Sequence, residues 1–358
     1  MPLNLLRQKM REHNLDGFIV TQAENRRYLS GFTGSAGTLI ISGERQIFAA
    51  DFRYYEQVRQ QAPAWTLARV SYDFAGRLPE ILDDLGLHSK QVGFESQNVT
   101  VNQLESWQEK LQEQASLVPT SGFVEQLRQV KGEDEAAAIR KAVALADAAL
   151  DYISEWIQPE MTEKQVAWEL EVFLRTRGAD ALAFPPIVAA GPQGALPHAR
   201  PGERTIAPGE PVVMDLGCVV DGYCSDVTRT FCLGQPSSDK YLEVWNLVQQ
   251  AVERARAGIY GGISGKAADE LARSIIKAAG YGDNFGHSLG HGVGLAVHEG
   301  PRLSFRYDDP VPAGAIVTIE PGVYLPGEFG VRLEDMVLVT DGGAEVLTQA
   351  PKIAILPR

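Results

Sequence analysis

From about residue 132 onward, the sequence passes twice through the same order of elements, which limits the folds that it can adopt. Residues 133–157 carry apolar side chains at helical spacing, with acidic residues in the first turn that interact favourably with the helix dipole. Thr162 and Gln165 form a capping-box pattern that begins a second helix, which we predict to end at Gly178. Strand-like segments rich in glycine and proline follow to about residue 233.

The same order then returns, with helices predicted over about 239–257 and 265–279 and strand-like segments from there to the C-terminus. The two passages share no evident sequence identity, so the repetition is one of pattern alone. We therefore predict that residues 130–358 form one domain composed of two similar halves.

Residues 1–125 follow another pattern, in which short strand-like runs alternate with helical segments. The strand-like runs are apolar or β-branched and comprise DGFIVT (16–21), GTLIIS (37–42), RQIFAAD (45–51) and QVGFE (91–95). The segments LPEILDDLGL and TVNQLESWQEKLQE carry apolar residues at helical spacing. We predict a small α/β domain over residues 1–125, without a catalytic motif of its own.

Composition excludes several classes of protein. The formal net charge of −13 argues against a nucleic-acid partner, which requires a dense lysine and arginine surface, and most of this acidity is explained by solubility. No apolar run approaches the roughly 18 residues of a membrane span, so no membrane partner is expected. Three cysteines in a chain whose N-terminus lacks the apolar core of a signal peptide indicate reduced thiols, and we expect a cytoplasmic protein.

The segment 210–234 brings two aspartates together if it forms a hairpin. Asp221-Gly222, between two β-rich runs, is a strong signal for a two-residue turn. In that register Gly217 faces Asp226, and Asp215 projects from the same face as Gly217 because strand side chains alternate. The two aspartates would then form a diagonal pair roughly 7–8 Å apart. A metal ion between them would relieve their repulsion, and two solvated surface aspartates are the alternative.

Five further acidic or imidazole side chains are candidates for this set. His287, His291 and His298 lie in the glycine-rich segment 286–300, where the backbone can approach a bulky or charged group closely. Glu320 ends an apolar strand before Pro-Gly, and Glu334 interrupts another apolar strand, where an unpaired carboxylate is costly to bury. Each glutamate alone is most often a strand-end or edge residue, and two in consecutive strands need partners.

Taken together, these residues offer four carboxylates and at least one imidazole, a ligand set that suits two divalent ions such as Mn²⁺, Co²⁺ or Zn²⁺. The two cations would balance the four negative charges. A water molecule between the ions would lose a proton near neutral pH and act as a nucleophile.

Several segments resemble the motifs of a known family. MDLGCVVDGYCSDVTRT, HSLGHGVGLAVHE, TIEPGVY and VRLEDMVLV are similar to motifs of the pita-bread metallopeptidases, in the branch of aminopeptidase P and prolidase. NRRYLSGFTGSAGTLII and DFRYYEQ resemble the creatinase-like N-terminal domain that accompanies it. The resemblance implies an α+β pita-bread domain of two pseudo-symmetric halves, with helices packed on a curved, mostly antiparallel sheet, and a homodimer.

The resemblance also assigns roles to residues of this sequence. The metal ligands are expected to be Asp215, Asp226, His291, Glu320 and Glu334. The catalytic residues are expected to be His198, His298 and, as the proton acceptor, Glu320. The substrate-binding residues are expected to be His287, Arg332, Tyr324 and Phe184. Of these, Tyr324 and Phe184 are proposed as the wall of a proline pocket, with ordinary core packing as the alternative.

The implied activity is that of a Xaa-Pro aminopeptidase, which hydrolyses the bond between an N-terminal residue and a following proline by a hydroxide that bridges two metal ions. We expect Mn²⁺ as the metal, with Co²⁺ or Zn²⁺ as alternatives, and a peptide with proline at its second position as the partner. FTGSAGT and DFRYYEQ favour aminopeptidase P. The alternative is a Xaa-Pro dipeptidase (prolidase) with the same dinuclear site. A second alternative is a non-catalytic peptide-binding protein of the same fold.

Two other motifs do not fit their context. Gly286 to Gly290 spells the G-x-S-x-G of serine hydrolases, but an apolar strand does not precede it and no acidic residue lies between Ser288 and His298. Gly290, Gly292 and Gly294 lack the spacing of a dinucleotide-binding loop.

Overall fold

The computed structural model describes residues 2–71 and 73–357, and the chain divides into two compact units, Met1–Arg128 and Gln129–Arg358. The sequence pattern places the division between residues 125 and 130. None of the helices in the described ranges is long and apolar enough to cross a membrane.

The first unit is built on a six-stranded sheet in the order β4-β3-β2-β1-β5-β6. Its strands are β1 (Gly17–Val20), β2 (Thr38–Ser42), β3 (Gln46–Ala50), β4 (Thr66–Arg69), β5 (Gln91–Glu95) and β6 (Ser116–Thr120). Strand β2 is antiparallel to both of its neighbours, and the outer pairs β3–β4 and β5–β6 are parallel. The helices are α1 (Pro2–Glu12), α2 (Ala23–Ser30), α3 (Tyr55–Gln61), α4 (Phe74–Asp84), α5 (Val101–Leu111) and α6 (Glu125–Arg128). The predicted α/β class is confirmed.

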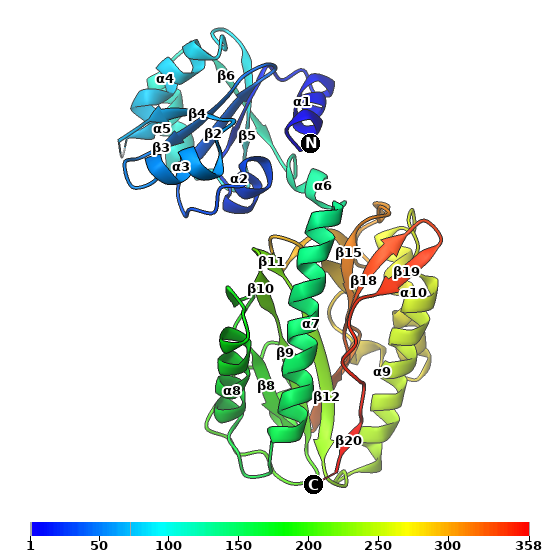
Figure 1. The fold of residues 1–358 in the computed structure, drawn as a ribbon. Helices are drawn as coiled ribbons and strands as arrows, with labels where there is room; N and C mark the ends of the chain where they lie inside the picture. The colour runs from blue at the N-terminus through cyan, green and yellow to red at the C-terminus, as the bar shows by residue number, and fades with distance from the viewer. Residues whose placement is uncertain (1, 72, 358) are drawn as a thin grey trace. The chain divides into compact units, whose positions relative to one another are not determined.

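The predicted helix pairs of the second unit are confirmed in type and place. They are α7 (Glu133–Trp156), α8 (Glu163–Thr176), α9 (Asp239–Gly258) and α10 (Gly265–Ala278). The capping box of Thr162 and Gln165 forms as predicted, and Ser264 caps the corresponding helix α10 of the second half. Helix α7 packs through a buried row of alanines, whose small side chains allow its backbone to approach the strands closely (Figure 1).

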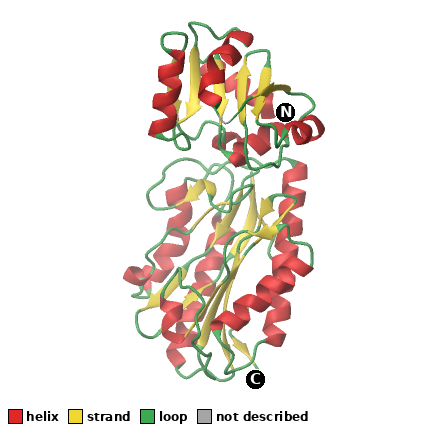
Figure 2. Cartoon of the chain, turned by 90° about the vertical axis from the view of Figure 1, so that its left-hand side faces the viewer, coloured by secondary structure: helices red, strands yellow, loops and turns green. Residues whose placement is uncertain are grey.

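The strands of the second unit lie between its helices (Figure 2). The first half contains β7 (Ala181–Leu182), β8 (Ile187–Ala190), β9 (Pro211–Leu216), β10 (Cys218–Val220), β11 (Tyr223–Cys224) and β12 (Val227–Leu233). The second half contains β13 (Gly290–Gly292), β14 (Glu299–Leu303), β15 (Ile316–Ile319), β16 (Gly322–Leu325), β17 (Phe329–Arg332), β18 (Asp335–Thr340), β19 (Gly343–Val346) and β20 (Ile355–Leu356).

These strands form four sheets within the described residues, the largest being β20-β12-β9-β8 and β14-β13-β15-β18-β19. Their pairing is antiparallel except that β20 runs parallel to β12, so the predicted antiparallel character is confirmed. Each half has a main apolar core, and a smaller apolar cluster joins the two halves. Helices α7 and α8 bury their apolar faces on β8, β9 and β12, whereas α9 and α10 pack on strands of the second half.

The predicted hairpin at Asp221-Gly222 forms. Val220 pairs with Tyr223, and farther along the ladder Leu216 pairs with Val227, which keeps the same register on both sides of Asp226. Asp221 has a φ of 51°, a left-handed conformation that aspartate tolerates in tight turns. The local turn therefore fixes how the aspartates of the hairpin are presented.

The cysteines of this hairpin region are core residues. Cys218 and Cys232 are fully buried, and burial raises the pKa of each thiol to about 11. Because a raised pKa depletes the reactive thiolate, only about one thiol in 10³ is ionised at pH 8. We expect iodoacetamide to leave both residues unmodified in the native chain and to label them after denaturation, as mapped by mass spectrometry. Rapid labelling of either thiol in the folded protein would contradict their burial.

Candidate metal centre

A cavity of about 630 Å³ in the second unit is lined by residues from both halves. All the residues that the sequence suggested for the site line it, namely Phe184, His198, Asp215, Asp226, His287, His291, His298, Glu320, Tyr324, Arg332 and Glu334. Residues that are more than 100 positions apart in the chain thus face one space.

The carboxylates reach this cavity from equivalent places in the two halves. Asp215 lies near the end of β9 and Asp226 directly before β12, which is antiparallel to β9. Glu320 directly follows β15 and Glu334 directly precedes β18, which is antiparallel to β15. Glu334, which was expected to interrupt an apolar strand, occupies the short gap between β17 and β18.

The ligand atoms fall into overlapping groups. One oxygen each from Asp215, Asp226 and Glu334 lie within 4.8 Å of one another, and the same holds for ligand atoms of His291, Glu320 and Glu334. Because Glu334 belongs to both groups, the arrangement suits two adjacent cations that share a carboxylate.

His291 presents its Nε2 to these carboxylates. Its Nδ1 lies 3.1 Å from the carbonyl oxygen of Gly292, an acceptor, so Nδ1 carries the proton. Its Nε2 lies 3.3 Å from Glu320 Oε1 and 3.6 Å from Asp226 Oδ2, where it could bind a cation together with these carboxylates. This is how a histidine ligand is usually oriented, with the second nitrogen fixed by the backbone.

The electrostatics of the cluster also call for cations. Burial, and then the charges of the neighbouring carboxylates, raise the pKa values of Asp226 and Glu334 well above their ordinary range. Asp215 Oδ1 and Glu334 Oε1 are buried without a hydrogen-bond partner among the described residues. Two orphaned carboxylate oxygens that face like charges fit a cation far better than an apolar core.

The second oxygen of each of these carboxylates is held by the protein. Arg332 Nη2 donates to Asp215 Oδ2 over 2.7 Å, and Thr228 Oγ1 donates to Glu334 Oε2 over 2.7 Å. Thr318 Oγ1 similarly donates to Glu320 Oε1 over 3.2 Å. Each carboxylate therefore keeps one oxygen for a cation. The threonines were not predicted, since a β-branched residue in a strand is ordinarily a packing residue.

Arg332 also anchors a chain of hydrogen bonds along the wall of the cavity. Its Nη1 donates to Tyr324 Oη over 2.9 Å, and this hydroxyl lies 2.9 Å from His287 Nε2. His287 Nδ1 lies 2.8 Å from the carbonyl oxygen of Ser288, so Nδ1 is the donor and Nε2 accepts the tyrosine proton. Burial lowers the pKa of His287, which is consistent with this neutral ring.

His198 and His298 are more exposed than the other site residues. The ring of His298 lies 4.3 Å from that of His291, centroid to centroid, and burial together with His291 lowers the pKa of His298 to about 4. Its ligand atom also falls within 4.8 Å of those of Asp226 and His291, so the geometry alone permits a third ligand group.

The rest of the cavity wall is mainly apolar and carries two arginines that the sequence did not single out. The apolar lining comprises Phe184, Pro185, Pro186, Ile187, Pro197, Ala199 and Pro201. Arg200 and Arg302 add positive charge to the same wall. Both are exposed arginines in loops or at a strand edge, which sequence alone cannot distinguish from ordinary surface residues.

Comparison with known families decides the assignment. The model of metallopeptidase family M24 matches residues 137–341, which include all the carboxylates described above. The chain belongs to metallopeptidase family M24. Residues 2–130 match the creatinase/prolidase N-terminal domain, so the resemblance stated from the sequence motifs is confirmed for both parts of this M24 peptidase.

Solved structures and curated relatives match this M24 peptidase over nearly its whole length. A Xaa-Pro dipeptidase from Bacillus anthracis is 41% identical, with a TM-score of 0.95 and coverage of 99% of this chain and 98% of that chain. An X-Pro aminopeptidase from Thermotoga maritima is 36% identical, with a TM-score of 0.90 and coverage of 99% of both chains. A Xaa-Pro dipeptidase from Pyrococcus furiosus is 35% identical over 345 residues, 96% of each chain.

Proposed function

We propose that this M24 peptidase is a metal-dependent Xaa-Pro dipeptidase, which hydrolyses the bond between an N-terminal residue and a C-terminal proline. The observation that carries the proposal is the pair of overlapping ligand groups in a cavity whose remaining wall is apolar. The sequence motifs favoured an aminopeptidase, with a dipeptidase as the alternative. The names of the relatives from Bacillus anthracis and Pyrococcus furiosus support that alternative better.

The residues that would hold two divalent ions are Asp215, Asp226, His291, Glu320 and Glu334. Ligands of this kind accept Mn²⁺, which we propose as the metal, and also Co²⁺ or Zn²⁺. Bound ions would polarise the scissile carbonyl and make a water molecule nucleophilic near neutral pH.

Glu320 is suited to accept a proton from the attacking water. One of its oxygens is fixed by Thr318 and lies 3.3 Å from His291 Nε2, which holds the carboxylate at the edge of the cluster. His298 and His198 line the cavity beside it and can donate to the developing oxyanion or to the leaving proline nitrogen. Arg332 keeps Asp215 in place while Tyr324 and His287 form the adjoining wall.

The wall of the cavity suits a short substrate that ends in proline. Phe184 and the neighbouring prolines provide apolar surface for a pyrrolidine ring, which offers no N–H to recognise once it is acylated. Arg200 and Arg302 can pair with the carboxylate that follows proline in a dipeptide. In a longer peptide this negative charge lies farther away, so the same arginines would select for length.

Hydrolysis of Ala-Pro compared with Ala-Pro-Ala tests the choice of substrate. We expect kcat/KM to be higher for the dipeptide by about 10-fold or more, because the paired carboxylate contributes binding that the tripeptide lacks. Release of alanine is measured with each peptide after addition of Mn²⁺, and a sample with excess chelator is the control for metal dependence. Activity in the chelated sample equal to that with metal would refute metal-dependent hydrolysis.

A Xaa-Pro aminopeptidase is the second candidate, and the similarity to the enzyme from Thermotoga maritima favours it. Equal or faster cleavage of Ala-Pro-Ala would establish this candidate in place of the first. A homodimer and a cytoplasmic location remain predictions from the sequence.

A further inference from the structure

The backbone of Glu334 is held on both sides by strand β12. Its N–H donates to the carbonyl oxygen of Thr228 over 3.0 Å. On the other side, Nη1 of Arg229 donates to the carbonyl oxygen of Glu334 and, over 2.9 Å, to that of Thr228. Arg229 is only 3% exposed, so it makes these contacts out of reach of solvent. Because a buried guanidinium is costly to desolvate, its hydrogen bonds must compensate for the hydration that it loses.

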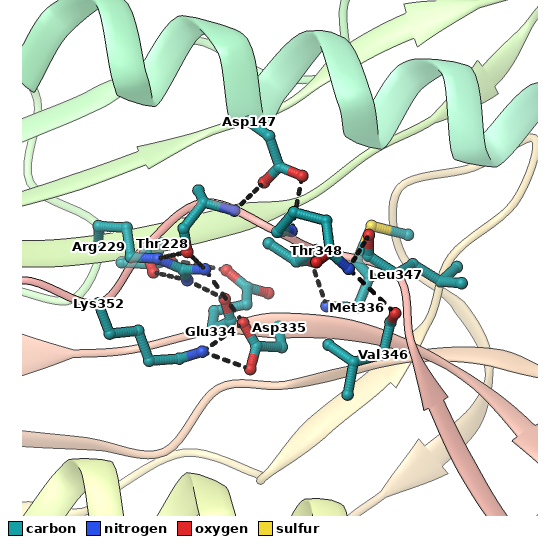
Figure 3. A network of polar contacts seen from close by, with 12 residues as sticks. Asp147, Thr228, Arg229, Glu334, Asp335, Met336, Val346, Leu347, Thr348 and Lys352 are labelled. Atoms are coloured by element: carbon teal, nitrogen blue, oxygen red, sulfur yellow. Dashed lines mark hydrogen bonds and ion pairs between the residues drawn. The ribbon is translucent and has the colours of Figure 1, made fainter.

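Arg229 is itself held by a carboxylate and by the C-terminal segment, as Figure 3 shows. Its Nη2 lies 3.1 Å from Asp335 Oδ1, while Nε and Nη2 both donate to the carbonyl oxygen of Ala350, over 3.1 and 2.6 Å. Lys352 Nζ donates to both oxygens of Asp335 over 2.8 and 2.7 Å. The N–H of Ala350 in turn donates to Asp147 on α7 over 2.9 Å. The guanidinium is thus fixed from three directions.

The adjacent residues Glu334 and Asp335 lie in different surroundings. Glu334 lines the cavity, whereas Asp335 is fully buried in the cluster behind it. The carboxylate of Glu334 stands close to those of Asp215 and Asp226, and before cations bind their like charges push it outward. Thr228 Oγ1 holds one oxygen of this side chain, and a fixed peptide group keeps in place the Cα from which the side chain extends.

We propose that Arg229 is a positioning residue of the metal centre, which fixes the peptide that follows Glu334 so that this carboxylate remains within reach of both ligand groups. The inference rests on the proposed function only in that the centre binds cations. It does not depend on which peptide is cleaved.

The shape of the arginine side chain explains why it fills this role. The planar guanidinium directs several N–H groups at fixed angles, and here they reach the carbonyl oxygens of Glu334 and Ala350 and the carboxylate of Asp335 at the same time. A lysine at this position would keep the positive charge beside Asp335 but would lose the fork that joins the three acceptors.

The test is a titration of the full-length, chelator-treated chain with Mn²⁺ by calorimetry, at a temperature where each variant is folded. Arg229→Met should raise the dissociation constant for Mn²⁺ about 10- to 100-fold, the usual loss when a partner that orients a ligand is removed. An unchanged dissociation constant and an unchanged number of bound ions would overturn the proposal, whatever the change in thermal stability.

Lys352→Met is the matched control. It also removes a cation from Asp335, but it leaves the contacts of Arg229 with the Glu334 backbone in place. This variant should unfold at a lower temperature and bind Mn²⁺ as tightly as the wild type. An equal loss of affinity in both variants would overturn the proposal, because it would trace the effect to the loss of one of the cations that surround Asp335.

If Arg229→Met does not fold, Arg229→Lys replaces it in the titration. Weaker Mn²⁺ binding by this variant supports the proposal, and wild-type affinity contradicts it. A wild-type chain that binds none of Mn²⁺, Co²⁺ and Zn²⁺ would refute the proposed function itself. By contrast, a wild-type chain that binds Mn²⁺ and cleaves Ala-Pro, together with an unaffected Arg229→Met variant, refutes the positioning role alone.

Discussion

Asp226→Ala should lose bound metal and hydrolyse Ala-Pro about 10³-fold more slowly or worse, since the ions supply several kcal/mol of transition-state stabilisation. Asp226 contributes to two of the ligand groups, one with Asp215 and Glu334 and one with His291. The helical circular dichroism should persist, because Asp226 precedes strand β12 and lies in no helix, and its removal takes one acidic group out of a buried cluster. Metal content by mass spectrometry and steady-state rates measure the two effects.

The same hairpin offers a control for Asp226→Ala. Asp221 lies at the exposed turn, where its side chain pairs with Lys141 over 2.8 Å. Asp221→Asn keeps a residue that tolerates the left-handed turn and should retain both metal and rate, because exposed ion pairs contribute little. Wild-type metal content and activity in Asp226→Ala would remove that residue from the centre.

His298→Ala should keep its metal but lower kcat for Ala-Pro by about 10²- to 10⁴-fold, the usual contribution of a proton donor or acceptor in the transition state. The ring of His298 lies beside that of His291 and lines the cavity, where it can reach the scissile bond. The outcome also separates two roles for this residue, since its position near Asp226 and His291 equally permits coordination.

Metal content decides between these roles of His298. A loss of metal in step with the loss of rate would make the residue a ligand, and an unaffected rate would make it a packing residue. His88→Ala is a suitable control, because His88 is an exposed histidine of the first unit and should change neither quantity.

The sequence predicted the turns and helix starts that depend on interactions between residues close together in the chain. The turn at Asp221-Gly222 sets the register of its hairpin, and the caps at Thr162 and Ser264 set the starts of helices. Strands β4 and β6 were missed because they carry few buried side chains and lack the alternation or apolar run that identifies a strand. The order of the strands in each sheet depends on long-range pairing, which no single segment encodes.

In the candidate site, too, only some of the residues could be predicted from the sequence. Its acidic and imidazole residues could be predicted, because such side chains are unusual in apolar strands and near glycines. Their partners could not be predicted. Arg332 was expected to bind substrate, and the structure shows that it pairs with Asp215. Thr228 and Arg229, which hold Glu334 from a strand of the other half, carry no signal that a sequence pattern could reveal.

The equal contribution of the two halves has a consequence for how the second unit remains assembled. Each half presents two carboxylates at the meeting ends of an antiparallel strand pair, so the ions would add a further link between halves that an apolar cluster and the contacts of β12 with Glu334 already join. Whatever binds only the assembled form stabilises it by mass action. We therefore expect the metal ions to stabilise the second unit as well as to take part in catalysis. Without metal, unfolding should begin at the contact between the two halves.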